Sequence, residues 1–360
     1  MAKRENDPRL QKLFDEKKNV YSISKLNCID QCLYQAYCTY ILKDRGLNNC
    51  YGIMGSKIHD VLEAIINGDA TEKELTPALQ AELNDLNMLD IEFPNENIKT
   101  SWISDMTHLC NNFVKPKGEF TTEELVIYKI NEDRYVQGYL DLIQHNKDNT
   151  ISIWDWKTSS QFSKEDLLHH GRQLVFYALA KEQEGEIVKT VGWIMLKYCQ
   201  IDFMGKARSN SKNETLITKI CNRSKIIKEL QSYIESDLAK LGYDEVDIEI
   251  LINEALENNS FDKFPVEIRN KYIVKPYVRK YEITEELKKE TLDYINNIAD
   301  IYESKTKDKK EWTFRKLIND KGKDDTFFCN VLCSHRKSCP EIKKHNELKI
   351  MLQANDEELF

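Results

Sequence analysis

The sequence predicts an α/β fold in which a central mixed sheet is flanked by helices. Residues 58–66 carry apolar side chains at the spacing of one helix face. Residues 124–158 contain three β-rich segments separated by short polar turns, and a helical segment and a further strand follow them. The order helix, three strands, helix, strand is typical of a sheet covered by helices.

The first helix is predicted between Gly55-Ser56 and Gly68. Apolar residues recur there at the i, i+3, i+4, i+7 and i+8 positions, which lie on one face of a helix. They are Ile58, Val61, Leu62, Ile65 and Ile66. The spacing indicates an amphipathic helix that packs against a core.

The segment from Glu124 to Thr158 is rich in Val, Ile, Tyr and Trp, which favour strands. Its three parts, ELVIYKI, RYVQGYLDLI and TISIWDWKT, are separated by the polar turns NED and QHNKDN. We therefore expect a three-stranded antiparallel meander. The helical segment KEDLLHHGRQLVFYALAKEQ and the strand VGWIMLKYC come next.

Around this core, the composition divides the chain into parts. An acidic segment, about residues 69–120, is predicted to be a helical insertion into the core. The predicted parts are an N-terminal tail (1–20), the core (21–204), a mostly helical lobe (205–326), a cysteine-bearing segment (327–345) and an acidic C-terminal tail (346–360).

The composition excludes two classes of protein. With 41% apolar and 31% charged residues, the chain is globular rather than disordered. Its longest apolar run, 191–196, is far shorter than the ~20 residues of a membrane-spanning helix. The charged N-terminal segment does not resemble a secretory signal, so we expect a cytoplasmic location. Ten cysteines in a reducing compartment favour metal-binding or buried thiols over disulfides.

The net charge of −8 hides a segregation of charges along the chain. Residues 197–231 carry eight Lys and Arg against three acids, and residues 305–323 have the same counts. Such segments can line a phosphate-binding channel on an otherwise acidic protein. The alternative is that both segments are solvated surfaces.

The clearest candidate for chemistry is Asp155-x-Lys157 in the last strand of the meander. Strand alternation places both side chains on one face, with Ile151 and Ile153. The carboxylate suits a hard divalent cation, and the ammonium suits orienting or deprotonating an attacking water, as phosphodiester hydrolysis requires. The alternative is a surface ion pair.

Asp141, in the neighbouring strand, has an apolar setting. If the two strands pair, Asp141 and Asp155 converge on one cation, which relieves their mutual repulsion. Gly138 would allow a backbone or a ligand to approach closely. His59, at the edge of the apolar helix face, is a candidate nitrogen ligand for the same metal; a structural role is the alternative.

Two residues of the following helix extend the candidate site. Gln173 and Tyr177 are four residues apart and share a helix face, where an amide and a phenol can hold a phosphate or a base. Ordinary helix packing is the alternative. Glu124, at the start of the first strand, is either a supporting acid or a strand-end charge.

Together these residues resemble the PD-(D/E)XK nuclease superfamily, in its RecB-like branch. That branch has a helical histidine followed by G-x-x-D, D/E-x-K and Q-x-x-x-Y motifs. The matching segments are His59 in GSKIHDVLE, Gly138–Asp141, Asp155–Lys157 and Gln173–Tyr177. The resemblance covers about residues 20–200 and the C-terminal cysteines.

The resemblance implies a restriction-endonuclease-like fold, with a central mixed sheet flanked by helices and elaborated by helical insertions. It also implies that His59, Asp141 and Asp155 bind Mg²⁺ or Mn²⁺. Lys157 would serve the nucleophilic water, and Gln173 and Tyr177 would contact the substrate near the metal.

The cysteines are similar to those of the iron-sulfur members of that branch. SISKLNCIDQCLYQAY resembles their S-x-S-x-L opening and Cys-Pro, with Leu33 in place of proline, which puts Cys32 at the ligand position. CNVLCSHRKSC resembles their C-x2-C-x5-C segment, with a first gap of three residues, and supplies Cys329, Cys333 and Cys339. The resemblance implies a [4Fe-4S] cluster that staples the N- and C-terminal regions together. A four-cysteine zinc site, or another choice of ligand such as Cys28 or Cys38, is the alternative.

The function implied is a metal-dependent DNA exonuclease acting on single-stranded or end-containing DNA. Recombination, repair, replication and CRISPR spacer processing are the candidate pathways. The sequence contains no G-x-x-x-x-G-K-[ST] phosphate loop, so unwinding would come from a partner such as a helicase. A recombinase or single-strand-annealing protein is another candidate partner. The alternative functions are a structure-specific endonuclease and a non-catalytic nucleic-acid-binding protein that keeps the fold and the cluster.

Overall fold

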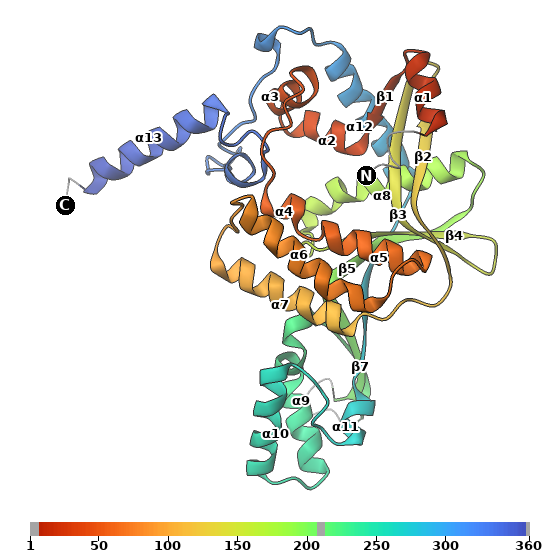
Figure 1. Ribbon diagram of the computed structural model, residues 1–360, viewed down its shortest axis with the longest axis vertical. Helices are drawn as coiled ribbons and strands as arrows, with labels where there is room; N and C mark the ends of the chain where they lie inside the picture. The colour runs from red at the N-terminus through yellow and green to blue at the C-terminus, as the bar shows by residue number, and fades with distance from the viewer. Residues whose placement is uncertain (1–6, 207–212, 358–360) are drawn as a thin grey trace.

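The computed structural model describes residues 7–206 and 213–357, and one mixed sheet extends through both lobes of the molecule (Figure 1). The strands are β1 (Asn19–Ser22), β2 (Glu119–Lys129), β3 (Arg134–His145), β4 (Ile151–Lys157), β5 (Val188–Gly205), β6 (Thr215–Asn222) and β7 (Ile273–Tyr281). The helices before the meander are α1 (Pro8–Asp15), α2 (Ile23–Gln31), α3 (Leu33–Ala36), α4 (Cys50–Ile53), α5 (Ser56–Asn67), α6 (Leu75–Met88) and α7 (Glu96–Asn112). The later helices are α8 (Lys164–Gln183), α9 (Ile226–Lys240), α10 (Glu245–Asn258), α11 (Val266–Lys271), α12 (Glu285–Glu303) and α13 (Pro340–Glu357).

The sheet has the strand order β1-β3-β4-β5-β6, with β2 also paired to β3 and β7 to β5. The strands β2, β3 and β4 form the predicted antiparallel meander. β5 runs parallel to β4, because α8 carries the chain back across the sheet between them. The prediction of a central mixed sheet flanked by helices is confirmed.

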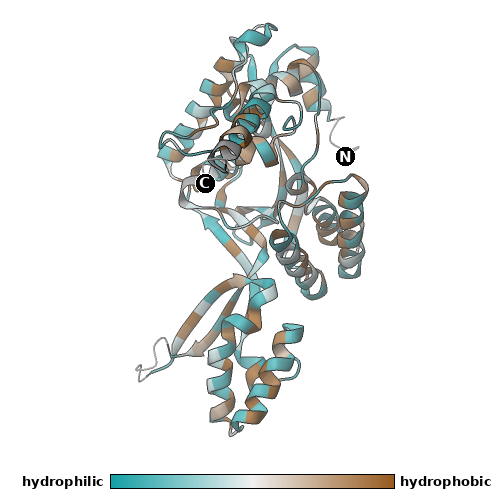
Figure 2. Ribbon diagram, turned by 90° about the vertical axis from the view of Figure 1, so that its left-hand side faces the viewer, coloured by the Kyte–Doolittle hydropathy of each residue, from teal (hydrophilic) through white to brown (hydrophobic). Residues whose placement is uncertain are grey.

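Helices cover both faces of the sheet in the core. α2, α8 and α12 pack on one face, around side chains such as Leu140 and Phe176. The predicted helix α5 packs on the other face, together with α6 and α7 of the predicted helical insertion, around Leu142 and Trp102. Figure 2 shows these helices banded in polar and apolar colours, as expected for helices with one face against a core.

The helical lobe is smaller than the predicted range 205–326. A separate core joins α9, α10 and α11 to the distal part of β5 and β6. β7 then pairs with β5, and α12 packs on α2 and α8. β7 and α12, which fall within the predicted range of the lobe, thus belong to the same sheet and core as the meander.

The two predicted tails contain regular structure. Asp7 caps α1, which buries Leu10 and Leu13, and β1 follows and pairs with β3. At the other end, α13 continues to Glu357 and projects away from the body of the molecule (Figure 1). Residues 1–6 and 358–360 of the predicted tails lie outside the described residues.

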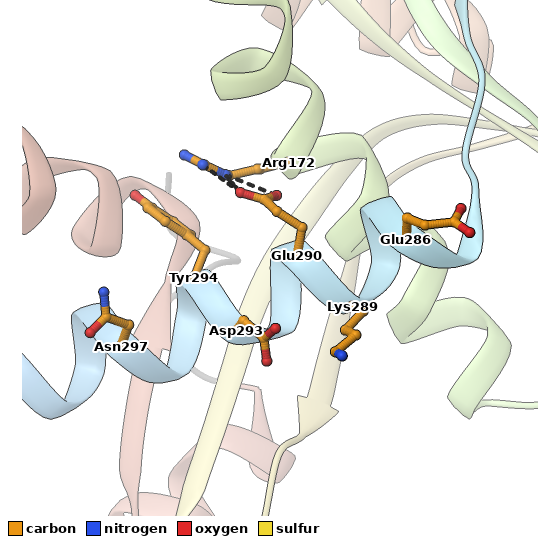
Figure 3. Close-up of a pocket in the computed structure, with 7 residues that line it drawn as sticks. All are labelled: Arg172, Glu286, Lys289, Glu290, Asp293, Tyr294 and Asn297. Carbon is orange, nitrogen blue, oxygen red and sulfur yellow. Dashed lines mark hydrogen bonds and ion pairs between the residues drawn. The ribbon is translucent and has the colours of Figure 1, made fainter.

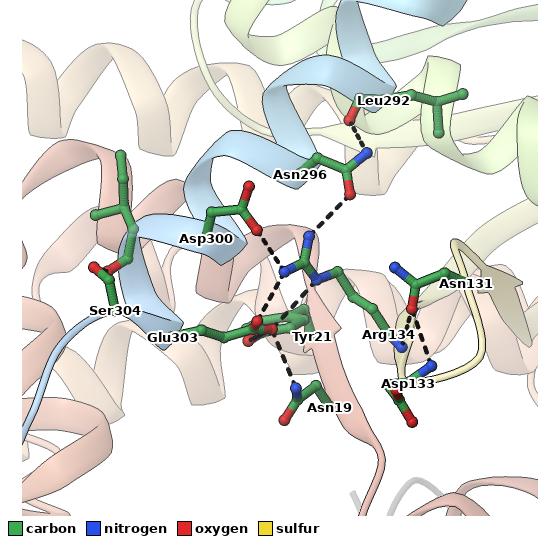
Figure 4. Close-up of polar contacts among 11 residues, drawn as sticks. Asn19, Tyr21, Asn131, Asp133, Arg134, Leu292, Asn296, Asp300, Glu303 and Ser304 are labelled. Carbon is green, nitrogen blue, oxygen red and sulfur yellow. Dashed lines mark hydrogen bonds and ion pairs between the residues drawn. The ribbon is translucent and has the colours of Figure 1, made fainter.

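A buried arginine ties the last core helix to the sheet. The guanidinium of Arg134, at the start of β3, donates to Asp300 at 2.6 Å, to Glu303 at 2.8 Å and to Asn296 at 2.9 Å (Figure 4). The hydroxyl of Tyr21 on β1 donates to the same Glu303 at 2.8 Å. Because these contacts join α12 to β1 and β3, they hold the N-terminal strand in the sheet.

Candidate active site

The G-x-x-D segment lies in a gap of the sheet. On one side of β3, β1 pairs with residues as far as Gln137, and β4 pairs with residues from Leu142 onward. Gly138–Asp141 therefore pair with neither strand. Asp141 fills part of the gap, since its Oδ2 accepts the backbone N–H of Trp156 on β4 at 3.0 Å.

Asp155 and Lys157 lie together at the end of β4, as predicted. Asp155 is 2% exposed, and the Lys157 ammonium lies 2.6 Å from its Oδ2. Burial raises the pKa of Asp155 to about 6, with a further upward contribution from Asp141 and an opposing one from Lys157. Burial lowers the pKa of Lys157, but the carboxylates of Asp155 and Asp141 outweigh that effect and raise it overall. Two acids and one cation thus share a poorly solvated space.

His59 lies on α5, which packs on the face of the sheet opposite to α8. Its ring lies edge-on to Trp156, with centroids 6.0 Å apart, and the charges of Asp155 and Lys157 both act on it. Burial lowers the pKa of His59 to about 4, so the imidazole is neutral near pH 7. Its buried Nε2 has no hydrogen-bond partner among the described residues. A neutral ring with an unused nitrogen is the form in which histidine binds metals.

Gln173 and Tyr177 lie on the face of α8 that covers the gap. The amide of Gln173 donates to the Tyr177 hydroxyl at 2.8 Å. Burial raises the pKa of Tyr177, and the charge of Asp155 raises it further. A Cβ at Gly138 would lie 2.7 Å from Cε1 of Tyr177. The close approach predicted at Gly138 is therefore made by this aromatic ring.

Two further residues that sequence reasoning missed, Glu82 and Thr158, hold α5 in place. The helix begins after Gly55, which has no side chain to cap it, and the buried Glu82 of α6 accepts the backbone N–H of Ser56 at 2.9 Å. Thr158, directly after Lys157, donates to the carbonyl of Met54 at 3.1 Å. Gly55 is backed against Thr158 so closely that a Cβ would overlap it. Glu82 had a sequence signal, because it shares the apolar face of α6 with Leu75, Leu79 and Leu86.

The acid singled out in the first strand has a structural role. Glu124 pairs with Lys181 of α8 at 2.7 Å, and Lys181 also contacts Glu184 at 2.8 Å. The neighbouring residue of β2, Glu123, lies between Thr122 and Glu124, which pair with Leu142 and Leu140 on either side of Asp141, and it has a left-handed backbone with φ of 49°. Its charge acts on the Tyr177 hydroxyl. Glu123 is therefore the acid of this pair that lies nearer the site.

Metal binding is tested by the donor set of the site. Among the described residues, no group of three His, Cys, Asp or Glu side chains is arranged to hold a metal ion. The chemistry of the donors nevertheless suits a cation: His59 has an unused buried nitrogen, and Asp155 is a buried acid whose charge is balanced by one lysine. The residues fit a divalent ion in type, and their side chains have to converge further to bind one.

The predicted cysteine ligands gather where the two ends of the chain meet. Cys32 separates α2 from α3, and Cys329, Cys333 and Cys339 follow the core at the other end of the sequence. Burial, together with the nearby thiols of the other three cysteines, raises the pKa of Cys333 to about 12. Cys28 lies next to Cys32 and Tyr40. Cys38 lies next to Tyr34, and the charge of Cys339 contributes to raising its pKa.

Direct contacts hold these two segments together. Leu47 donates its backbone N–H to the carbonyl of Ser334 at 2.7 Å, and the side chain of Asn49 donates to the carbonyl of Leu332 at 2.6 Å. Gly46, with φ of 64°, lies so close to Ser334 that a Cβ would lie only 2.5 Å from its carbonyl oxygen. The N- and C-terminal regions are thus joined by direct protein contacts.

The basic segment 197–231 is only partly available to a ligand. Arg223 is buried, and its guanidinium donates to the carbonyl of Leu196 at 2.7 Å. Lys219 lies over the ring of Tyr233, and Lys225 is exposed. Residues 207–212, which carry two more of the cations, lie outside the described residues. In the segment 305–323, Lys309 lies over the ring of Tyr34 beside the cysteines.

A shallow hollow of about 600 Å³ lies between α8 and α12 (Figure 3). Arg172 donates to Glu290 at 2.6 Å, and its guanidinium lies 4.0 Å from the centre of the Tyr294 ring. Because the arginine is paired and stacked, this hollow is explained by helix packing.

Comparisons with known proteins agree with the geometry. A family model described as the PD-(D/E)XK nuclease superfamily matches residues 20–340. A search of curated proteins returns no match. In the described part of the chain, every helix is too short or too polar to cross a membrane.

Proposed function

Because the chain belongs to the PD-(D/E)XK nuclease superfamily, we propose that it is a metal-dependent exonuclease of the RecB-like branch that hydrolyses DNA from free ends. The observation that carries this proposal is that His59, Asp141, Asp155 and Lys157 meet where β3 pairs with neither β1 nor β4. Members of the superfamily are generally nucleases, and they usually use Mg²⁺ or Mn²⁺.

His59, Asp141 and Asp155 would hold the cation. When bound, a divalent ion makes water a stronger nucleophile and balances the charge that develops on the phosphate. Lys157 now pairs with Asp155, so coordination of Asp155 would free the ammonium to face the attacking water. Gln173 and Tyr177, already bonded to each other, would orient the phosphate or base beside the gap.

We further propose that Cys32, Cys329, Cys333 and Cys339 bind a [4Fe-4S] cluster. The support is their position at the contact between the chain's two end regions and the mutual influence of their thiols. Four thiolates suit such a cluster, and closing so long a loop would stabilise the fold. A zinc ion on the same cysteines is the competing proposal.

The activity is tested with end-labelled linear DNA and circular DNA, each single- and double-stranded, with and without Mn²⁺. Degradation restricted to substrates with ends supports the exonuclease. Cleavage of circles would point to an endonuclease, and binding without cleavage would point to a non-catalytic protein. Asp155→Ala is the matched inactive control.

The cysteine proposal is tested on protein purified without oxygen. A brown protein with absorbance near ~400 nm and about four irons per chain is expected. Replacing any of Cys32, Cys329, Cys333 or Cys339 with serine should bleach it, whereas Cys28→Ser should not. Stoichiometric zinc without iron would overturn the cluster in favour of zinc.

A further inference from the structure

A groove of about 1100 Å³ lies between the core and the helical lobe. The C-terminal end of α7 and the loop after it, residues 113–118, form one wall. The lobe forms the other wall, through residues 257–262 and the first half of β7. Side chains of the sheet form the floor; they are Leu142, Gln144, Trp154, Trp156, Ile194 and Leu196.

The floor of this groove is the reverse face of the strand that carries the proposed catalytic residues. Along β4, Trp154 and Trp156 alternate with Asp155 and Lys157. The backbone N–H of Trp156 donates to Asp141, and the centre of its ring lies 6.0 Å from that of the His59 ring. Trp156 therefore lies between the groove and the gap in the sheet where the proposed site lies.

Aromatic rings and cations both line the groove. Phe113, Phe120, Trp154 and Phe261 are all half-buried, so part of each ring is accessible. The indole N–H of Trp154 donates to Gln144 at 3.1 Å, which fixes the orientation of that ring. Aromatic rings held in a fixed orientation are suitable surfaces for stacking unpaired bases.

The charged side chains around the groove favour binding of a phosphate backbone on the side of the 113–118 loop. Lys115 and Lys117 are exposed there, and Val114 between them is 78% exposed. Lys275, on the lobe side, is paired with Asp202 at 2.7 Å, and Glu257 and Asp262 also stand on that side. A phosphate backbone would therefore be attracted to the loop and repelled by the lobe acids.

On the premise of the proposed nuclease function, we propose that this groove binds the unpaired strand of the DNA substrate next to the cleavage site. Its bases stack on Trp154 and Phe120, and its phosphates contact Lys115 and Lys117. A duplex hides its base faces inside the double helix, so the apolar floor would give it nothing to stack on. The groove thus favours single-stranded over double-stranded DNA.

The test measures equilibrium binding by fluorescence anisotropy in EDTA, in an Asp155→Asn background that prevents cleavage. The probes are an oligo(dT) strand, an abasic strand of the same length and charge, and a duplex. We expect the abasic strand and the duplex each to bind at least about fivefold more weakly than oligo(dT), since stacking of a single base has this effect. A Trp154→Ala variant should remove the preference for bases, and Trp154→Phe should retain most of it.

The charged wall has its own variant and its own control. Lys115→Glu with Lys117→Glu should weaken binding of oligo(dT) and of the abasic strand alike, because both carry phosphates. Lys343→Glu with Lys344→Glu, the same charge change on the projecting α13, should leave binding unchanged. The proposal that the groove binds the unpaired strand would be overturned by equal affinity for oligo(dT) and abasic strands. It would also be overturned if both the tryptophan variant and the loop-lysine variant bound DNA as well as the wild type. Those results would not touch the proposed nuclease function, which fails separately if Asp155→Asn still cleaves DNA in Mn²⁺.

Discussion

Buried acids in the core and in the helical lobe have opposite surroundings. In the lobe, Asp237 accepts hydrogen bonds from Lys240 at 2.8 Å, Lys271 at 2.6 Å and Tyr272 at 2.7 Å. Burial alone would raise its pKa, but these donors outweigh burial and lower it. In the core, Asp155 has one lysine beside it and a second acid nearby, and its pKa is raised to about 6.

The difference separates structural acids from reactive ones. Asp202, at the junction of core and lobe, repeats the pattern of Asp237, since hydrogen bonds from Lys275, Gln200 and Thr218 lower its pKa to about 2. A fully bonded carboxylate stabilises the fold and has no capacity left for a ligand. Asp155 is held in the less stable charged form, which a bound cation would relieve.

The contrast between Asp155 and Asp237 predicts its largest effect on the rate of DNA cleavage. Asp155→Asn should lower the cleavage rate at least about a thousandfold, because several kcal/mol of charge stabilisation in the transition state would be lost. Lys157→Ala should do the same. Asp237→Asn, an identical change of side chain in the lobe, should keep the wild-type rate per folded molecule in a DNA cleavage assay with Mn²⁺. Near wild-type cleavage by Asp155→Asn would disprove the proposed site.

In the absence of metal, substitution of Asp237 should change the free energy of unfolding more than substitution of Asp155. Asp237→Ala should lower the free energy of unfolding by roughly 3–5 kcal/mol, because it leaves two lysines without their buried partner. Asp155→Asn should change it by no more than about 1 kcal/mol, since an acid with a raised pKa already opposes folding when charged. Urea unfolding in EDTA measures both. If the two variants were equally destabilised, the distinction between bonded and under-bonded acids would be lost.

Glu82 is an intermediate case, and it gives a prediction of pH dependence. Burial raises its pKa from 4.5 to about 7, although backbone N–H groups at the start of α5 oppose the rise, and its Oε2 has no hydrogen-bond partner among the described residues. The folded protein keeps this proton when the unfolded chain has lost it. The contribution to stability is therefore fully present below about pH 4.5 and is lost as the pH rises through 7.

Glu82→Gln should remove this loss of stability at higher pH while keeping a side-chain oxygen to cap α5. The free energy of unfolding of the variant, minus that of the wild type, should increase by up to roughly 3 kcal/mol between pH 4.5 and pH 8. Urea titrations of both proteins at the two pH values give the difference directly. A difference independent of pH would mean that Glu82 is charged in the folded protein throughout this range.

The smallest effect is expected from two lysines of the basic segment 197–231. Lys219→Glu with Lys225→Glu should weaken binding to all DNA sequences alike and make the salt dependence shallower, by about 0.7 in log–log slope for each lost contact to a single strand. Arg223 is left unchanged because its side chain is buried and bonded to Leu196. An unchanged slope would show that this segment is a solvated surface and would leave the 113–118 loop as the positive wall.

Local pattern was enough to predict much of this protein. The helix α5, the meander of β2, β3 and β4, and the helix α8 were all predicted, because alternation and helical spacing are properties of neighbouring residues. The shared face of Asp155 and Lys157 follows from the same alternation. The family motifs occur within these elements, which is why candidate site residues could also be proposed from the sequence.

The tertiary structure decided what depends on residues far apart in the chain. The gap at Gly138–Asp141 exists because β1, more than a hundred residues earlier, pairs with only the start of β3. The return of β7 to the core sheet, the capping of α5 by Glu82 and the groove beside Trp154 likewise join distant segments. Hydrophobic periodicity records which face of an element is buried but not what covers that face. Pairing partners and the surroundings of buried charges are therefore set only when the whole chain packs.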